Sequence, residues 1–157
     1  MSKEKPWYET VVLPALLRHA RSTYGKAMHA ALAEAGCDDV PHNGLYIIGG
    51  LALGAGGVPL GQLVKELSVS KQAAGQLVDT LVLRGYLERS TDAEDRRKLT
   101  IRLTARGQMA AQAQAKARAR IDKELLARVG EESVIHCRET LAALIAIGRG
   151  QEDEVEH

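Results

Sequence analysis

Residues 58–107 change from a helical to a strand pattern of apolar residues, and this change limits the folds that the chain can adopt. In the first part, apolar residues recur at i, i+3, i+4 and i+7, which predicts a helix that begins after Pro59. In the last part, apolar and polar residues alternate, which predicts a strand. The residues that carry the patterns are Leu60, Leu63, Val64 and Leu67 for the helix, and Leu99, Ile101 and Leu103 for the strand.

A second helix is predicted after a short turn at residues 68–70, because Ser70 is a favourable N-cap residue. Glutamine can pair with adenine through two hydrogen bonds and lysine can contact phosphate, so the polar face of this helix is typical of one that reads a DNA major groove. An ordinary solvated helix face is the alternative. The face expected to be buried holds Ala73, Ala74, Leu77, Val78, Leu81 and Val82, and the polar face holds Lys71, Gln72, Gly75, Gln76 and Asp79.

Two strands and a charged hairpin are predicted after Gly85, which is expected to end the second helix. The strands are residues 86–90 and 99–103, and Val58 is expected to add a small third strand. A carboxylate in the hairpin can orient a neighbouring arginine, and a narrow minor groove attracts such a cation. A solvated turn with local ion pairs is the alternative. The charged residues of the hairpin are Asp92, Glu94, Asp95, Arg96, Arg97 and Lys98.

The stretch RGYLERSTDAEDRRKLTIRLTARG resembles the wing signature of the MarR family of bacterial transcriptional regulators. In that family a Gly-aromatic-Leu strand leads to an Asp-x-Arg wing and then to Leu-Thr-x-x-Gly. The matching residues here are Gly85, Tyr86, Leu87, Asp95, Arg97, Leu103, Thr104 and Gly107.

The resemblance implies a mainly α (α+β) fold: a winged helix-turn-helix with a two-to-three-stranded wing, flanked by N- and C-terminal dimerisation helices. It also implies a homodimer whose second motif helix enters the major groove, while the wing arginine, Arg97, enters the minor groove with Asp95 as its orienting partner. The chain differs in having few basic residues on the reading helix. The residues expected to contact DNA are Ser70, Lys71, Gln72, Gly75, Gln76, Arg84, Asp95, Arg96 and Arg97.

The chain is expected to be a single domain of residues 1–157, with residues 40–103 as the DNA-binding lobe and residues 1–35 and 104–149 as a helical dimerisation region. A helix is predicted over residues 7–35, with a kink or a break at Pro14. The apolar spacing after Glu131 predicts a last helix with Cys137 in the core. Two reading helices about 34 to 36 Å apart would match a pseudo-palindromic operator.

The charge balance does not by itself indicate a nucleic-acid partner, because 21 Lys and Arg oppose 20 Asp and Glu. Residues 84–106 are more basic, with seven positive and four negative side chains. No signal peptide or membrane span is predicted, so we expect a cytoplasmic protein without a membrane partner. The two cysteines suggest neither a disulfide framework nor a metal cluster.

No enzyme motif is found: there is no Gly-rich phosphate loop, nucleophile elbow or histidine pair at i, i+4. We therefore expect no cofactor and no metal. Many MarR-family regulators respond to a small molecule, so the resemblance implies a repressor released by an effector, with His19, His42 and Tyr46 as candidate effector-binding residues. Each of these is otherwise simply a packed or exposed side chain.

Two other functions remain open from the sequence. One is a winged-helix protein-interaction module without DNA binding, which the thinly basic reading helix favours and the wing arginines oppose. The other is a thiol-based redox sensor that uses Cys37. The neighbouring Asp38 and Asp39 disfavour the thiolate that such a sensor needs.

Overall fold

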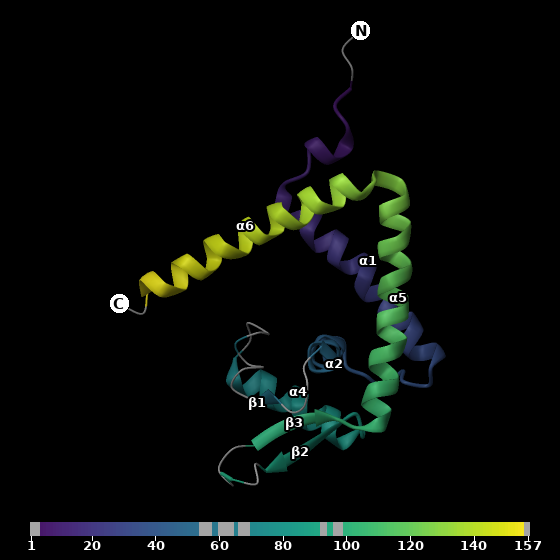
Figure 1. The fold of residues 1–157 in the computed structure, drawn as a ribbon, viewed down its shortest axis with the longest axis vertical. Helices are drawn as coiled ribbons and strands as arrows, with labels where there is room; N and C mark the ends of the chain where they lie inside the picture. The colour runs from purple at the N-terminus through teal and green to yellow at the C-terminus, as the bar shows by residue number, and fades with distance from the viewer. Residues whose placement is uncertain are drawn as a thin grey trace. The chain divides into compact units, whose positions relative to one another are not determined.

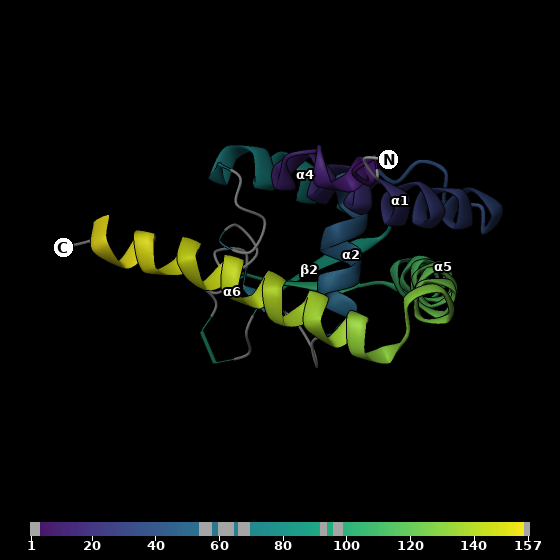
Figure 2. The same ribbon diagram turned by 90° about the horizontal axis from the view of Figure 1, so that it is seen from above.

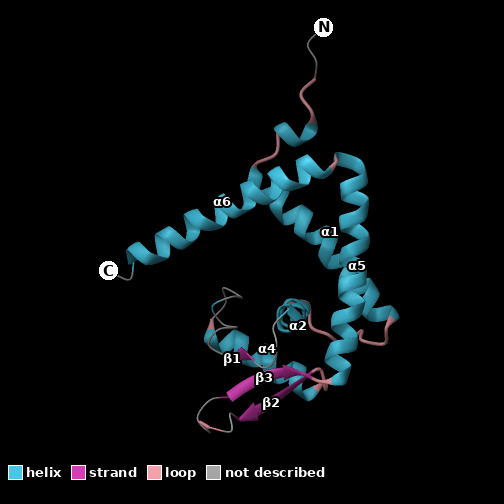
Figure 3. Cartoon of the chain, in the orientation of Figure 1, coloured by secondary structure: helices cyan, strands magenta, loops and turns pink. Residues whose placement is uncertain are grey.

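The computed structural model describes residues 4–53, 58–59, 65, 70–91, 94–95 and 99–155. They form two compact units, Met1–Arg118 and Ala119–His157. Most of the chain is helical and one small sheet follows the middle helices (Figures 1 and 3). In chain order the elements are η1 (Trp7–Glu9), α1 (Leu13–Glu34), α2 (Gly44–Leu53), β1 (Val58–Pro59), α4 (Lys71–Leu83), β2 (Leu87–Thr91), β3 (Leu99–Leu103), α5 (Ala105–Val129) and α6 (Glu131–Val155).

Helix α1 has Pro14 in its first turn and is followed by a glycine, Gly36. A short 3-10 helix, η1, precedes it, so Pro14 separates two helical pieces and does not kink one. This position suits proline because the first N–H groups of a helix have no partner within it. At the other end Gly36 has φ +75°, and the N–H groups of Gly36 and Cys37 donate to the carbonyls of Ala33 (3.1 Å) and Leu32 (2.8 Å). These bonds terminate the helix as the glycine predicts.

The sheet has three antiparallel strands in the order β1-β3-β2, so the third strand expected at Val58 is confirmed. Strand β3 has the predicted bounds, whereas β2 begins at Leu87, one residue later than predicted. The shift arises because the Tyr86 N–H still donates to Leu81 at the end of α4 (2.9 Å).

The core of the first unit lies where α1, α2 and α4 meet the sheet and the first turns of α5. Tyr86 is completely buried there, and a Cβ at Gly107 would lie 2.1 Å from the Tyr86 carbonyl oxygen. Glycine at position 107 therefore lets α5 approach the start of β2. The largest buried side chains are Tyr86, Leu32, Leu45, Ile47, Ile48, Leu81, Leu87, Ile101 and Gln114.

The second unit contains the end of α5 and all of α6, joined at Gly130, which has φ +81°. The helical spacing of α6 predicts a buried Cys137, but this prediction is wrong because Cys137 is exposed. Within this unit only the end of α5 is available to cover α6. Large apolar side chains remain exposed on both helices: Leu125, Leu126, Val129, Ile135, Leu141, Leu144, Ile145 and Ile147. No described helix is both long enough and apolar enough to cross a membrane.

Candidate nucleic-acid interface

Helix α4 starts at the residue that the sequence predicts. Ser70 has an extended backbone, and its Oγ accepts a hydrogen bond of 3.1 Å from the Ala73 N–H. A cap of this kind stabilises a helix by about 1 kcal/mol, because it satisfies an N–H group that has no partner within the helix. The first turn of α4 is thus fixed in place.

The polar face of α4 is open to solvent in the described chain. Lys71, Gln72 and Gln76 are exposed, and no atom lies within 4 Å of a Cβ built at Gly75. Asp79, on the same face, forms an ion pair with Arg89 of β2. Since that pair neutralises the only carboxylate of this face, the groups left for a ligand are amide and ammonium groups.

The buried face of α4 is narrower than predicted. Ala74, Val78 and Leu81 are buried, and Leu77 and Val82 are half-buried. The prediction that Ala73 is buried is wrong, because its side chain is exposed. Ala73 lies at the edge of the apolar stripe, where it borders an open groove between α2 and α4.

The C-terminal end of α4 is held by hydrogen bonds to the loop after α1. Gly85 has φ +82°, and its N–H donates to Val82 (3.0 Å), so the predicted glycine end of the helix is confirmed. The Arg84 guanidinium donates to the Asp39 carbonyl, and the Arg106 guanidinium donates to the Arg84 carbonyl. Arg84, expected to contact DNA, therefore also ties α4 to the preceding loop.

The Asp39 carboxylate is the centre of this cluster. It accepts hydrogen bonds from the Tyr86 hydroxyl and from Arg106, whose guanidinium lies 3.1 Å away and stacks 4.3 Å from the centroid of the Tyr86 ring. The hydrogen bond from Tyr86, helped by the charges of Arg106 and Arg84, holds the pKa of Asp39 below its ordinary value against the opposing effect of burial. Burial, and next the bond to Asp39, raises the pKa of Tyr86.

Sequence reasoning missed Asp39 and Arg106 as residues that hold the C-terminal end of α4 in place. A signal was present, because a buried tyrosine needs a hydrogen-bond partner for its hydroxyl. The partner could not be chosen from the sequence, since Asp39 and Tyr86 lie 47 residues apart.

The tip of the predicted wing is described only at Glu94, which is exposed, and Asp95, which is half-buried. Arg96, Arg97 and Lys98 lie outside the described residues, as does the predicted helix after Pro59 except for Lys65. At the base of the wing, Ser90 and Thr100 are joined across β2 and β3 by a hydrogen bond of 2.6 Å. The wing arginine therefore stays a prediction.

Two of the three candidate effector residues lie together. His42 and Tyr46 line a groove of about 720 Å³ between α2 and α4 and an adjoining groove of about 480 Å³ along α1. The Arg21 Nε donates to the Tyr46 hydroxyl (3.0 Å), and its guanidinium lies 4.3 Å from the centroid of the Tyr46 ring. His42 stacks on His29 with ring centroids 5.2 Å apart. His19 is exposed and lines neither groove.

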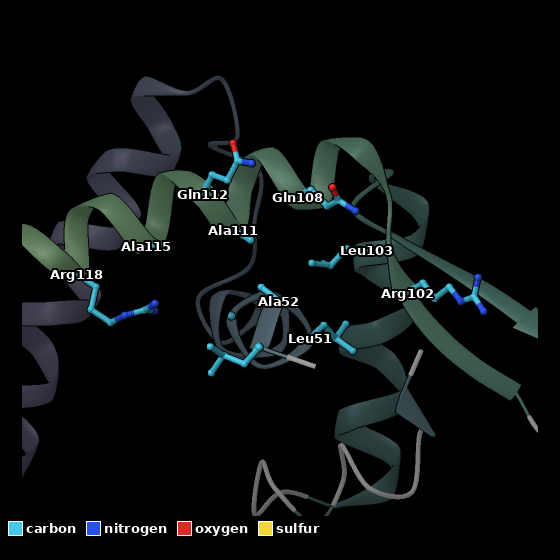
Figure 4. Close-up of a pocket in the computed structure, with 11 residues that line it drawn as sticks. Leu51, Ala52, Arg102, Leu103, Gln108, Ala111, Gln112, Ala115 and Arg118 are labelled. Carbon is cyan, nitrogen blue, oxygen red and sulfur yellow. The ribbon is translucent and has the colours of Figure 1, made fainter. Parts of the chain in front are cut away.

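A third cavity, of about 580 Å³, was not predicted. Apolar residues of α2, β3 and α5 line it, and Arg118 and Arg102 lie at its opposite ends (Figure 4). Its lining comes from two segments far apart in the sequence, residues 49–53 and residues 102–118, so no local pattern could have indicated it. The principal lining residues are Leu51, Ala52, Leu103, Gln108, Ala111, Gln112 and Ala115.

The capped helix α4, the following antiparallel strands and the flanking helices define a winged helix-turn-helix protein. Residues 40–98 match the model of the MarR family. This match confirms the resemblance to the MarR family that the wing sequence indicates. Comparison with curated proteins gives no match.

Several solved structures share this fold. Wild-type MarR from E. coli in its apo form is 20% identical over 85% of this chain and 97% of that chain, with a TM-score of 0.63. S. aureus MepR in a DNA-binding conformation is 18% identical over 87% and 98%, with a TM-score of 0.72. The transcriptional repressor CouR, bound to a 23-mer DNA duplex, is 19% identical over 92% and 99%, with a TM-score of 0.70.

Proposed function

We propose that this protein is a sequence-specific transcriptional regulator that binds a pseudo-palindromic DNA operator as a homodimer in the cytoplasm. The observation that carries the proposal is the exposed polar face of α4, capped by Ser70 and free of an unpaired carboxylate. This surface can approach base edges without burying a negative charge against DNA. Residues 40–103 would form the DNA-binding lobe, and residues 1–35 and 104–149 the dimerisation region.

Each residue of the interface has a defined role in this proposal. Gln72 and Gln76 are one helical turn apart and read neighbouring base pairs, while Gly75 between them leaves room for the base edges. Ser70, Lys71 and Arg84 contact phosphates, since Arg84 has other N–H donors besides the one that bonds Asp39. At the wing, Arg97 enters the minor groove, with Asp95 orienting it and Arg96 on the adjacent phosphates.

The homodimer is supported by apolar surface at both ends of the chain. Trp7 and Val12 are each 70% exposed, and α6 carries a row of exposed apolar side chains. Large exposed apolar side chains in such number favour an interaction site, and a second copy of the chain can cover them under two-fold symmetry.

We further propose that the protein is a repressor released by a small effector. The DNA-bound relative CouR is a transcriptional repressor. The cavity of Figure 4 combines an apolar floor with polar ends, as ligand sites do, and the grooves at His42 and Tyr46 offer a second location. An effector would release DNA only if it binds more tightly to an arrangement of the two lobes that does not fit the operator.

The test is selection from random DNA duplexes at two salt concentrations, followed by sequencing. Enrichment of a pseudo-palindrome, with affinity that falls steeply as salt rises, is expected. In the same assay Gln76→Ala should relax the preference at one base pair. A uniform loss on all sequences would contradict base reading by Gln76, and no enrichment at low salt would favour a protein-interaction module.

The burial of Cys37 argues against a redox sensor. Its side chain has 0% exposure, and its Sγ lies 3.8 Å from the Ala35 carbonyl oxygen. A buried thiol is poorly accessible to an oxidant. Thiol titration of the native protein before and after Cys37→Ser checks this, and we expect no difference in the fast-reacting fraction.

A further inference from the structure

The two grooves at Tyr46 join into one basic surface beside the reading helix. We call this surface the basic groove; its cationic residues are Arg18, Arg21, Lys26 and Arg84, and His42 lies where its two parts meet. Both parts belong to the first unit, in which α4 and α1 lie on the same side of α2 (Figure 2). Gln76 and Thr80 of α4 line the same groove, so it opens directly onto the reading face.

The basic groove has an excess of positive charge. The residues that line its two parts include no aspartate or glutamate. Arg18, Arg21 and Lys26 are exposed, and Arg18 and Lys26 form no ion pair with any residue that the structure describes. Arg21 is held in one orientation by its hydrogen bond to Tyr46 and its position over that ring. The basic groove therefore favours binding of an anion, because its cations are exposed and Arg21 is already oriented.

The length of the groove favours a polyanion over a small one. Arg18 and Lys26 are eight residues apart on α1, which corresponds to about 12 Å along a helix axis. A single small anion does not span that distance, whereas the phosphates of one DNA strand repeat about every 3.4 Å along the duplex axis.

The position of the basic groove also favours the DNA backbone as the anion. When Gln76 touches a base edge, the strand that borders the major groove must pass beside α4, because that groove is only about 12 Å wide. The basic groove lies directly beside Gln76. We propose that it binds backbone phosphates flanking the bases that α4 reads, through Arg18, Arg21 and Lys26, an inference that rests on the proposed function.

The test compares the salt dependence of DNA binding in two double variants. In Arg18→Gln/Lys26→Gln, two phosphate contacts are lost in each protomer, so the slope of log K against log salt should become shallower by about 1.8 per half-site. A fourfold rise in salt should then weaken the variant about 12-fold less per half-site than the native protein. Affinity should fall equally on operator and random DNA, and the selected sequence should not change.

A matched control removes the same charge elsewhere. Lys116→Gln/Arg120→Gln changes two exposed cations of α5 and should keep the native slope. Both pairs replace exposed helical residues with glutamine, a comparable helix former, so folding should be kept and thermal unfolding verifies it. On a duplex trimmed to the bases read, the native protein and the groove variant should bind alike.

Each other outcome has a definite meaning. An equal change of slope in both double variants would show a general charge effect and overturn the proposal. A native slope in the groove variant, with loss of thermal stabilisation by benzoate or inorganic phosphate, would make the groove a small-anion site. If the native protein shows no binding to any duplex at low salt, the proposed function fails and this inference fails with it.

Discussion

At the scale of single residues, Asp39 joins the end of α4 to the elements that follow it in the chain. Its carboxylate binds Tyr86 at the start of β2 and Arg106 at the start of α5, and its carbonyl binds Arg84 at the end of α4. Three elements are therefore fixed relative to one loop. A carboxylate is needed for this because only an ionised acceptor can take both donors with charge-assisted bonds.

Replacing Asp39 with Asn should lower the free energy of unfolding by about 1 kcal/mol at pH 7, the size of a partly solvated charge-assisted bond. The folded-state pKa of Asp39 lies below the ordinary value of 3.8, so its contribution is complete above that pH and is lost as the pH falls through the lowered value. Urea unfolding of both proteins at pH 7 and near pH 3 measures this. If the difference in unfolding free energy between the two proteins stays constant with pH, the Asp39 carboxylate does not stabilise the fold through its ionised form.

Substitution by alanine should have opposite effects on stability at Gly107 and at Gly75. Gly107→Ala should destabilise the fold by roughly 3 kcal/mol, because the new Cβ meets the Tyr86 backbone at 2.1 Å and α5 must shift. Gly75→Ala has open space and should stabilise α4 by up to about 1 kcal/mol. Chemical denaturation compares the two. If Gly75→Ala also weakens operator binding, base edges approach α4 at this position.

Whole elements were predictable where local chemistry determines them. Ser70 and Gly85 mark the ends of α4, and the alternation of β3 gives its bounds, because caps and strand periodicity act over a few residues. The partner of Tyr86, the cavity of Figure 4 and the exposure of Cys137 were not predictable. They depend on which elements meet in space, and a single sequence carries no direct record of that.

The cap of α4 can be separated from its role beside DNA. Ser70→Ala should lower the free energy of unfolding by about 1 kcal/mol, because the Ala73 N–H loses its acceptor. Ser70→Asp should keep the cap and the stability, but weaken DNA binding, because it adds a negative charge near phosphate. Thermal unfolding and operator titration of both variants test this. Equal DNA affinity for Ser70→Asp and the native protein would remove Ser70 from the interface.

On the scale of the whole molecule, the exposed apolar side chains of α6 favour contact with a partner chain. Leu141, Leu144 and Ile145 fall at helical spacing and are 37%, 42% and 55% exposed in the single chain. Such a row promotes aggregation when it is exposed in a monomer, and it stabilises an interface when a partner buries it. In the homodimer that we propose, burial between chains would explain the spacing that wrongly predicts a buried Cys137 within the chain.

Leu144→Asp should therefore convert the protein to monomers at concentrations where the native protein is a dimer, as measured by sedimentation equilibrium. Operator affinity should drop by a factor of about 100 or more, because two linked half-sites bind with avidity. Ala143→Asp adds the same charge at the preceding position of α6, away from that row, and is the control. Equal dissociation in both variants would argue that charge alone, and no specific apolar contact, separates the chains.

The exposed face of α4 also bears on how readily such a protein can acquire a new target. Lys71, Gln72 and Gln76 make no side-chain hydrogen bond to the residues that the structure describes, and the core and the Asp39 cluster do not use them. Their identities are thus free to vary with little effect on folding. A library randomised at these three positions should stay largely folded while its preferred operators diverge. DNA specificity could then change, by engineering or by evolution, without loss of the fold.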